Sequence, residues 1–158
     1  MAGTDNAIVI AAPLDFVWEA MNDIERWPEL FTEYAEATVL EREGDVIRFR
    51  LTTHPDPEYD GRVWSWTSER RIDHETHTTR SRRLETGPFE FMEIDWSFRP
   101  VDGGTEMRWV QRFRMKPGAP AGDEQAEDYM NRNTRTQMSV IKDRLESAAA
   151  RTAAAAAG

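Results

Sequence analysis

The sequence contains no cysteine and only three histidines, and these shortages exclude several kinds of site. Without cysteine the chain can form no disulfide, no thiolate metal site and no cysteine nucleophile. His54, His74 and His77 fall in or beside expected turns, and no two of them have the helical spacing of a zinc site. We therefore expect no metal ion and a reducing, cytoplasmic compartment.

Positive charge and long apolar runs are also scarce. The chain has 20 lysines and arginines against 29 acidic residues, a formal net charge of −9, so no uniformly basic face can neutralise nucleic-acid phosphates. No stretch approaches the roughly 18 apolar residues of a membrane helix, and the opening MAGTDN does not resemble a signal peptide. We expect neither nucleic acid nor a membrane as a partner.

Two sequence signatures of common enzymes are missing as well. No glycine-rich loop leads into a helix in the manner of a nucleotide-binding fold, and no serine stands in a nucleophile-elbow context. Cofactor binding and a hydrolase triad are therefore not indicated.

Tryptophan, in contrast, is abundant. The 158 residues include 6 tryptophans and 7 methionines. A chain of this length makes one domain, here residues 1–158, with enough material for a substantial core. Large flat side chains in such number must line or fill an interior.

The order of periodicities predicts an α+β fold. An apolar run at 7–11 indicates a strand, and helical spacing over 14–22 and 24–31 indicates two short helices. Alternating residues then predict antiparallel strands over residues 38–52, 62–72, 78–86 and 89–115, with turns at Gly44 and at Asp102 to Gly104.

The C-terminal part returns to helical spacing. An apolar stripe over 123–149 predicts a long helix, which we expect to cover the concave face of a curved sheet of about seven strands. Residues 148–158 are mostly alanine and have little to bury, so we expect a frayed extension of that helix.

Several polar residues fall on faces that should point inward. In the strand 62–72, Ser68 and Arg70 share a face with Trp64 and Trp66. Arg70 cannot lose its proton to escape burial, so it needs a partner, water or a ligand.

The neighbouring predicted strands also carry polar residues on otherwise apolar faces. Gln111 is the polar member of a row that contains Met107, Trp109 and Phe113, and Thr53 ends a row of apolar residues. Met92, Ile94, Trp96 and Phe98 form a further apolar row.

Each of these residues also has an ordinary explanation. An arginine near a strand end can extend into water, a glutamine can be a hydrogen-bonded core amide, and rows of tryptophan can simply be core. Their coincidence favours a cavity, because burying unpartnered polar groups costs about 1–3 kcal/mol each against a total stability of about 5–15 kcal/mol. Tyr34 follows the second predicted helix and should lie near the mouth of this cavity, either as packing or as a proton donor or acceptor.

Six blocks of the sequence carry a resemblance to a known family. The blocks TDNAIVIAAP, NDIERWPELFTEYAEA, GRVWSWTSER, RRLETGPFEFM, GGTEMRWVQRFRMKPGAP and NRNTRTQM resemble the single-domain aromatase/cyclases of bacterial type II aromatic polyketide pathways, especially the tetracenomycin and spore-pigment types, over residues 4–145. The resemblance implies a helix-grip fold related to START and Bet v 1 proteins. It also implies a cavity that receives a linear poly-β-ketone from an acyl carrier protein, closes the first ring between carbons 9 and 14, allows a second ring, and releases water to aromatise.

The resemblance also assigns residues. Its pocket arginines fall on Arg70 and Arg83, and its mouth tyrosine falls on Tyr34. Its pocket-lining residues fall on Trp27, Phe31, Thr53, Trp66, Ser68, Met92, Trp96, Trp109, Gln111, Asn133 and Thr134.

These assignments suggest a chemistry. We expect Arg70 to stabilise an enolate or alkoxide, Tyr34 to move protons, and Thr53, Ser68 and Gln111 to anchor ketone oxygens. Arg80, Arg82 and Arg83 form a local basic strand, which is either solvated or a landing site for the carrier protein. Alternation places Arg83 on the face opposite to Arg80 and Arg82, so of the three only Arg83 can point inward, as the resemblance implies. Two rival functions remain: a carrier of hydrophobic ligands, and a chaperone that folds the polyketide while closure proceeds unaided.

Overall fold

The fold is one seven-stranded sheet with a long helix against it, seen in a computed structural model that describes residues 2–157. The strands are β1 Ala2–Ile10, β2 Tyr34–Glu43, β3 Val46–Thr53, β4 Ser65–Asp73, β5 Thr78–Arg83, β6 Phe89–Val101 and β7 Gly104–Met115. The helices are α1 Leu14–Asn22, α2 Trp27–Leu30 and α3 Asp123–Ala157, with short 3-10 turns η1 Ile24–Arg26 and η2 Pro57–Tyr59.

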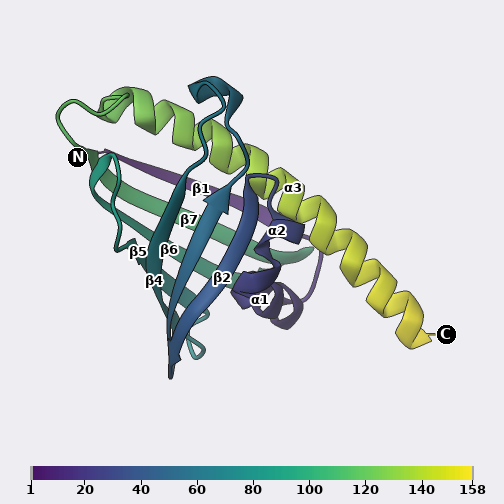
Figure 1. Ribbon diagram of the computed structural model, residues 1–158. Helices are drawn as coiled ribbons and strands as arrows, with labels where there is room; N and C mark the ends of the chain where they lie inside the picture. Colours follow the sequence, from purple (N-terminus) through teal and green to yellow (C-terminus); the bar gives the residue numbers. More distant parts are fainter. Residues whose placement is uncertain (1, 158) are drawn as a thin grey trace.

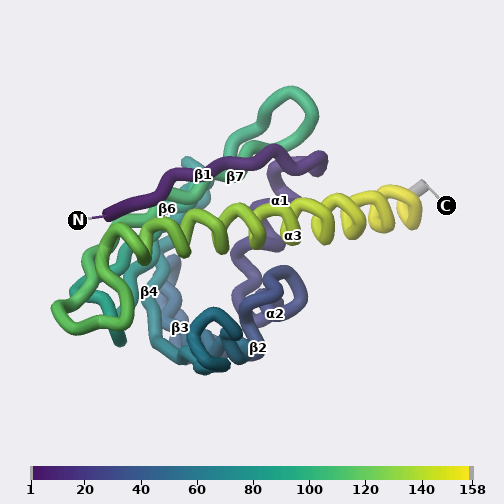
Figure 2. The backbone as a smooth tube through the Cα atoms, turned by 90° about the horizontal axis from the view of Figure 1, so that it is seen from above, coloured from purple at the N-terminus to yellow at the C-terminus, as the bar shows by residue number. Residues whose placement is uncertain are grey.

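The strands follow the order β1-β7-β6-β5-β4-β3-β2, and every neighbouring pair is antiparallel. The chain crosses from one sheet edge to the other through α1 and α2, which lie between β1 and β2 in sequence. Figure 1 shows the curved sheet with α3 running across it, and Figure 2 shows α3 alongside β1. This is the α+β, helix-grip arrangement expected from the sequence.

The core follows the sequence pattern. In β3 the alternate residues Ile47, Phe49 and Leu51 are buried, and in α3 the stripe that includes Met138 and Ile141 packs against the same core. Burial of alternating strand residues fixes which face of the sheet is concave and therefore which side chains can reach a ligand.

One glycine is required where β7 begins. Gly104 has a φ of +143°, and a Cβ atom there would lie 2.0 Å from the carbonyl oxygen of Ile10. Only glycine allows this approach between the β6–β7 turn and the end of β1.

Several boundaries differ from those expected. The strand expected over 7–11 is β1 Ala2–Ile10, the strand expected from residue 38 begins at Tyr34, and the helix expected over 24–31 is the 3-10 turn η1 followed by the short helix α2. The strand expected from residue 62 begins at Ser65, because residues 54–64 form a loop that contains η2. The strand expected to reach residue 86 ends at Arg83. The alanine-rich segment continues α3 to Ala157, with exposed side chains over 151–156, consistent with the high helix propensity of alanine. Figure 2 shows this end of α3 projecting beyond the sheet. No helix within residues 2–157 is both long and apolar enough to span a membrane.

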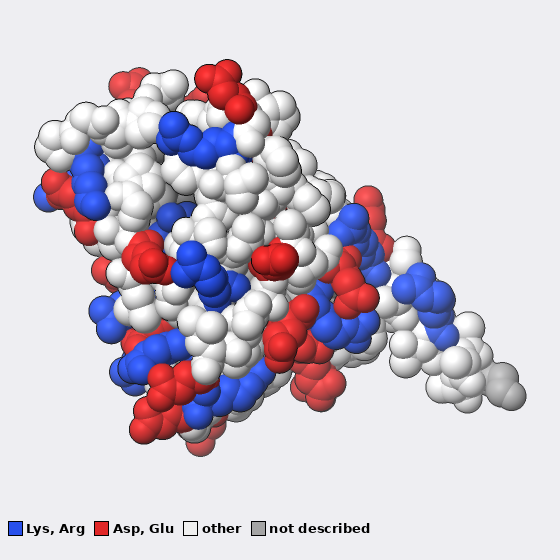
Figure 3. All heavy atoms as spheres, viewed as in Figure 1, with Lys and Arg blue, Asp and Glu red and all other residues white. Residues whose placement is uncertain are grey.

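Basic and acidic side chains alternate over the surface, as the face in Figure 3 shows. On the outer face of the sheet, Glu69 of β4 lies between Arg48 of β3 and Arg82 of β5, with N···O distances of 3.2 Å and 3.3 Å. The Glu69 side chain is only 8% exposed although both arginines reach solvent.

Glu69→Gln should therefore lower the free energy of unfolding by about 1–2 kcal/mol, because two charge-assisted hydrogen bonds to a buried group are weakened. Glu41→Gln is the matched control, since Glu41 also pairs with Arg48, at 2.8 Å, but is 54% exposed. Urea unfolding of the two variants measures the difference, and equal effects would contradict the importance of burial here.

Candidate active site

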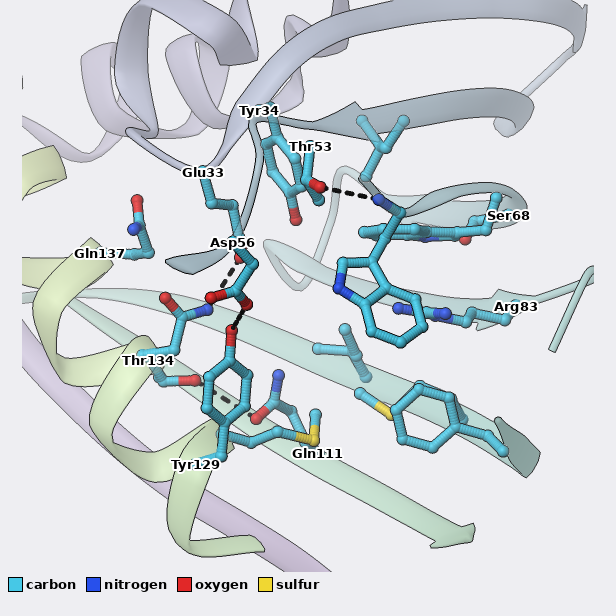
Figure 4. Close-up of a pocket in the computed structure, with 18 of the residues that line it drawn as sticks. Glu33, Tyr34, Thr53, Asp56, Ser68, Arg83, Gln111, Tyr129, Thr134 and Gln137 are labelled. Atoms are coloured by element: carbon cyan, nitrogen blue, oxygen red, sulfur yellow. Dashed lines mark hydrogen bonds between the residues drawn. The ribbon is translucent and has the colours of Figure 1, made fainter. Parts of the chain in front are cut away.

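A cavity of about 390 Å³ lies between the concave face of the sheet and α3. This volume is in the range of small-molecule binding sites, which are mostly apolar with a few placed polar groups. Its walls come from β2 to β7, the 54–64 loop, α2 and the first half of α3. Figure 4 shows polar groups reaching it from several of these elements.

Nearly all the residues expected to form the site do line this cavity. They are Trp27, Tyr34, Thr53, Trp66, Ser68, Arg70, Arg83, Met92, Trp96, Gln111, Asn133 and Thr134. Strand alternation had placed most of the sheet residues on the inward face, and their presence in the cavity lining agrees with this placement.

Phe31 and Trp109 were expected to line the cavity, and this expectation is wrong. Their rings stack on each other at 5.9 Å, and Trp109 stacks on Trp96 at 4.5 Å with an interplanar angle of 8°. Trp96 lines the cavity, whereas Phe31 and Trp109 form a layer that supports it. Neither the indole N–H of Trp96 nor that of Trp109 has a hydrogen-bond partner in the described chain.

Arg70 is a buried cation. Its side chain is among the most buried in the protein, at 1% exposed, so the alternative that it extends into water is wrong. The guanidinium lies over the rings of Trp96 and Trp27, at 4.4 Å and 5.5 Å, and both Nε and Nη2 donate to Asn22 Oδ1. Nη1 donates to Ser81 Oγ at 3.4 Å.

The charge of Arg70 has no carboxylate partner within residues 2–157. Burial alone lowers the pKa of its guanidinium to about 9. The fold therefore keeps an uncompensated positive charge at the wall of an aromatic cavity, which is unfavourable for stability and useful for an electron-rich ligand.

Arg83 is a second cation, and it points inward as alternation predicted. Its guanidinium lies 3.9 Å from the centre of the Trp66 ring and 4.8 Å from that of Phe89. Across the described residues it makes no hydrogen bond or ion pair, so its N–H donors remain available to a ligand (Figure 4). Burial lowers its pKa to about 10.

The other two arginines of this strand point outward. Arg80 Nε donates to Asp95 Oδ1 at 2.9 Å, and Arg82 pairs with Glu69. Both side chains are more than 60% exposed. Their side chains belong to the charged outer surface, although Arg82 is still among the residues that line the cavity.

Tyr34 begins β2 with its phenol directed into the cavity (Figure 4). Its ring stacks on Trp27 at 6.1 Å and lies 4.9 Å from Phe31. Burial above all, and then the negative charge of Glu33, raise the pKa of Tyr34 well above its ordinary value. The phenol is therefore protonated at neutral pH and can act as a proton donor.

Gln111 combines a structural and a ligand-facing role. Its Oε1 accepts hydrogen bonds from the hydroxyls of Thr4 and Thr134, which satisfies the carbonyl side of the amide. The amide nitrogen then remains as a donor at the cavity wall, where no acceptor from the described chain meets it. Thr53 is also engaged, because its Oγ1 accepts from the backbone N–H of Trp64 at 3.0 Å.

Sequence reasoning missed several polar residues of the cavity lining, among them Glu33, Asp56, Tyr129 and Gln137. Glu33 directly precedes Tyr34, and its Oε2 accepts from Asn133 Nδ2 at 2.8 Å. Tyr129 Oη donates to Asp56 Oδ2 at 2.7 Å, which joins α3 to the 54–64 loop at the mouth. Helical spacing could have placed Tyr129 beside Asn133, whereas a loop residue such as Asp56 follows no periodicity.

No three histidine, aspartate or glutamate side chains within residues 2–157 cluster as a metal ion would require. The polar groups of the cavity are instead two guanidiniums, a phenol, carboxyls, hydroxyls and amides. These groups can bind ketone oxygens, stabilise a negative charge and transfer protons.

Comparison with known proteins agrees with this geometry. Residues 10–139 match a family described as polyketide cyclase/dehydrase and lipid transport. A Streptomyces cyaneus protein named "Putative polyketide cyclase" is 54% identical over 147 residues, which cover 92% of this chain and 95% of that protein. The granaticin polyketide synthase bifunctional cyclase/dehydratase of Streptomyces violaceoruber is 27% identical over 140 residues, which cover 87% of this chain and 42% of that protein.

The fold also matches a solved structure. The Zhui aromatase/cyclase from Streptomyces sp. R1128 superposes with a TM-score of 0.79 at 21% identity, over 99% of this chain and 98% of that one. At this identity the likeness shows a shared fold. The family match and the Streptomyces relative show more: this chain belongs to the polyketide cyclase/dehydrase family.

Proposed function

We propose that the protein receives a linear poly-β-ketone from an acyl carrier protein, closes its first ring between carbons 9 and 14, and releases water to form an aromatic ring. The observation that carries this proposal is the pair of guanidiniums, buried Arg70 and half-buried Arg83, on the aromatic walls of a cavity that also holds the Tyr34 phenol. A plain apolar carrier needs no such groups.

Positioning is the main task in this reaction. The methylene between two ketones is already acidic, but a flexible poly-β-ketone offers many possible ring closures. A cavity of about 390 Å³ limits the shapes that such a chain can take, and holding one carbon about 3–3.5 Å from one carbonyl selects a single closure. Such a reaction needs no cofactor.

Arg83 is the better candidate for direct contact with the developing oxyanion. Its N–H donors have no partner in residues 2–157, whereas those of Arg70 are directed to Asn22 and Ser81. Arg70 would add a fixed positive potential at the deeper wall, where the low dielectric strengthens it. Ser68 and the amide nitrogen of Gln111 would bind further ketone oxygens.

The acyl carrier protein would approach the mouth formed by the 54–64 loop and α3. Arg80 and Arg82 lie on the outer face of β5, where they could attract the acidic carrier or the phosphate of its prosthetic arm. Their existing pairing with Asp95 and Glu69 makes this attraction modest and sensitive to salt.

Product analysis tests the proposal. Co-expression with a minimal type II polyketide synthase should shift the products from the mixture formed without this protein to one aromatised ring system closed between carbons 9 and 14. A mixture unchanged by the protein would contradict a cyclase. Unchanged ring closure with the same products bound tightly would instead support the carrier function.

Tyr34→Phe should slow cyclisation about 10²-fold, because the variant keeps the ring but loses the proton donor. Single-turnover product formation with the reconstituted synthase measures the rate. Circular dichroism melting should show an unchanged transition, since the phenyl ring can still stack on Trp27. A wild-type rate would mean that Tyr34 serves only in packing.

A further inference from the structure

We propose that Glu33 is the general base of this site and is held in position by Asn133. The proposal rests on the cyclase function above and goes beyond it by naming the group that takes the proton from carbon. No periodicity in the sequence marked Glu33, because it precedes β2 in a short connection.

The contacts of Glu33 orient its carboxyl group within the cavity wall. Asn133 of α3 donates its Nδ2 to Oε2 at 2.8 Å, so one carboxylate oxygen is tied to the helix. The backbone carbonyl of Glu33 accepts from the N–H of His54 at 2.9 Å, which fixes the main chain at the mouth loop. A base held at both its backbone and its side chain can meet a bound substrate in one geometry.

The charged and titratable groups around Glu33 come from four elements. Tyr34 lies on β2, His54 and Asp56 on the 54–64 loop, Arg83 on β5 and Tyr129 on α3. Burial is the largest influence and raises the pKa of Glu33, with the negative charge of Asp56 acting in the same direction. Asn133, Tyr34 and Arg83 oppose this shift without cancelling it. A carboxylate with a raised pKa is a stronger base than an exposed one.

The reaction balances with the groups present. The Glu33 carboxylate takes a proton from the methylene carbon between two ketones, and the electron pair passes to the enolate oxygen beside Arg83. The enolate carbon then forms the ring bond to a ketone carbon, whose oxygen becomes an alkoxide and takes the proton back from Glu33, directly or by way of the Tyr34 phenol, which restores the carboxylate. The carboxylate then takes a second ring proton and returns it to the departing hydroxyl, which leaves as water. A carbon–carbon double bond remains in the ring, and Glu33 and Tyr34 end in the protonation states in which they began.

Glu33→Gln is the central test, because glutamine keeps the size and the hydrogen bond to Asn133 but cannot accept the proton. We expect directed cyclisation with the reconstituted synthase to fall about 10²-fold or more, and Glu33→Asp to restore part of the rate. Glu36→Gln is the matched control, since Glu36 is exposed on β2 and does not line the cavity. Quenching of tryptophan fluorescence by 1,8-dihydroxyanthraquinone should be alike in all variants, which would show an intact cavity.

The pH profile separates a chemical role from a structural one. The wild-type rate should rise with pH through a pKa above that of an ordinary glutamate, because the base must lose its proton before it can act. Glu33→Gln should abolish this rise. Asn133→Leu should move it to higher pH, because Asn133 stabilises the carboxylate.

Two outcomes overturn the inference. A wild-type rate and profile in Glu33→Gln would show that another group takes the proton, while the proposed function would stand. A wild-type protein that leaves the synthase products unchanged would overturn the proposed function and this inference together.

Discussion

Replacing Arg70 by methionine should raise the stability of the protein and strongly slow directed cyclisation. The free energy of unfolding should rise by about 1–3 kcal/mol, because an apolar side chain of similar length replaces a buried charge that no carboxylate compensates. Directed turnover should fall about 10²–10³-fold, the loss typical when a preorganised electrostatic group is removed. Thermal melting and product analysis on the same samples measure both effects.

A second variant tests the hydrogen bonds that hold the buried Arg70 charge in place. Asn22→Ala removes the acceptor that receives both Nε and Nη2 of Arg70, so the charge stays buried with fewer partners. This variant should be destabilised by about 2 kcal/mol, opposite in sign to Arg70→Met. If Arg70→Met lowered stability instead, the guanidinium would be a structural element and not a charge retained for a ligand.

Replacing Arg83 by methionine should slow the chemistry as strongly as replacing Arg70. Its guanidinium faces the cavity with its N–H donors free of partners in the described chain, so it is the group best placed to bind an enolate or alkoxide oxygen. We expect the rate of directed cyclisation to fall about 10²–10³-fold and unguided products to accumulate. Rapid-quench assays with liquid chromatography and mass spectrometry would measure both.

Arg82→Met provides the matched control on the same strand. The Arg82 side chain points outward and pairs with Glu69, so at saturating carrier protein its loss should leave the rate nearly unchanged and affect only stability, carrier affinity and salt dependence. Equal losses of activity in Arg82→Met and Arg83→Met would show that the total positive charge of β5 matters, and not the direct contact of Arg83 with a ligand in the cavity.

Strand alternation was enough to predict the sheet part of the site. The period of two placed Trp66, Ser68 and Arg70 on one face, and it separated Arg83 from its outward neighbours. Buried polar residues on aromatic faces indicated a ligand because their burial is otherwise unfavourable. The strand placements agree with the cavity lining because one face of this antiparallel sheet covers the cavity and the core, whereas the ligand itself stays a prediction.

Strand alternation could not predict how far a side chain lies behind the cavity wall, nor the path of a loop. It gave Trp109 the same face as Gln111, but ring stacking behind Trp96 removes Trp109 from the wall. Asp56 reaches the mouth through a loop whose path follows no period, and it is met there by Tyr129 from a helix 73 residues away in sequence. Such long-range contacts follow from the tertiary packing of whole elements.

A crystal structure with a bound aromatic polyketide product would test the central claim most directly. The claim is that the guanidiniums of Arg70 and Arg83 lie among aromatic rings because they bind the oxygens of a folded polyketide. We expect the product between Trp66 and Gln111, with a product oxygen at hydrogen-bond distance, about 2.7–3.2 Å, from the Arg83 guanidinium. A product bound outside the cavity, or an Arg83 guanidinium turned to solvent with the product inside, would contradict it.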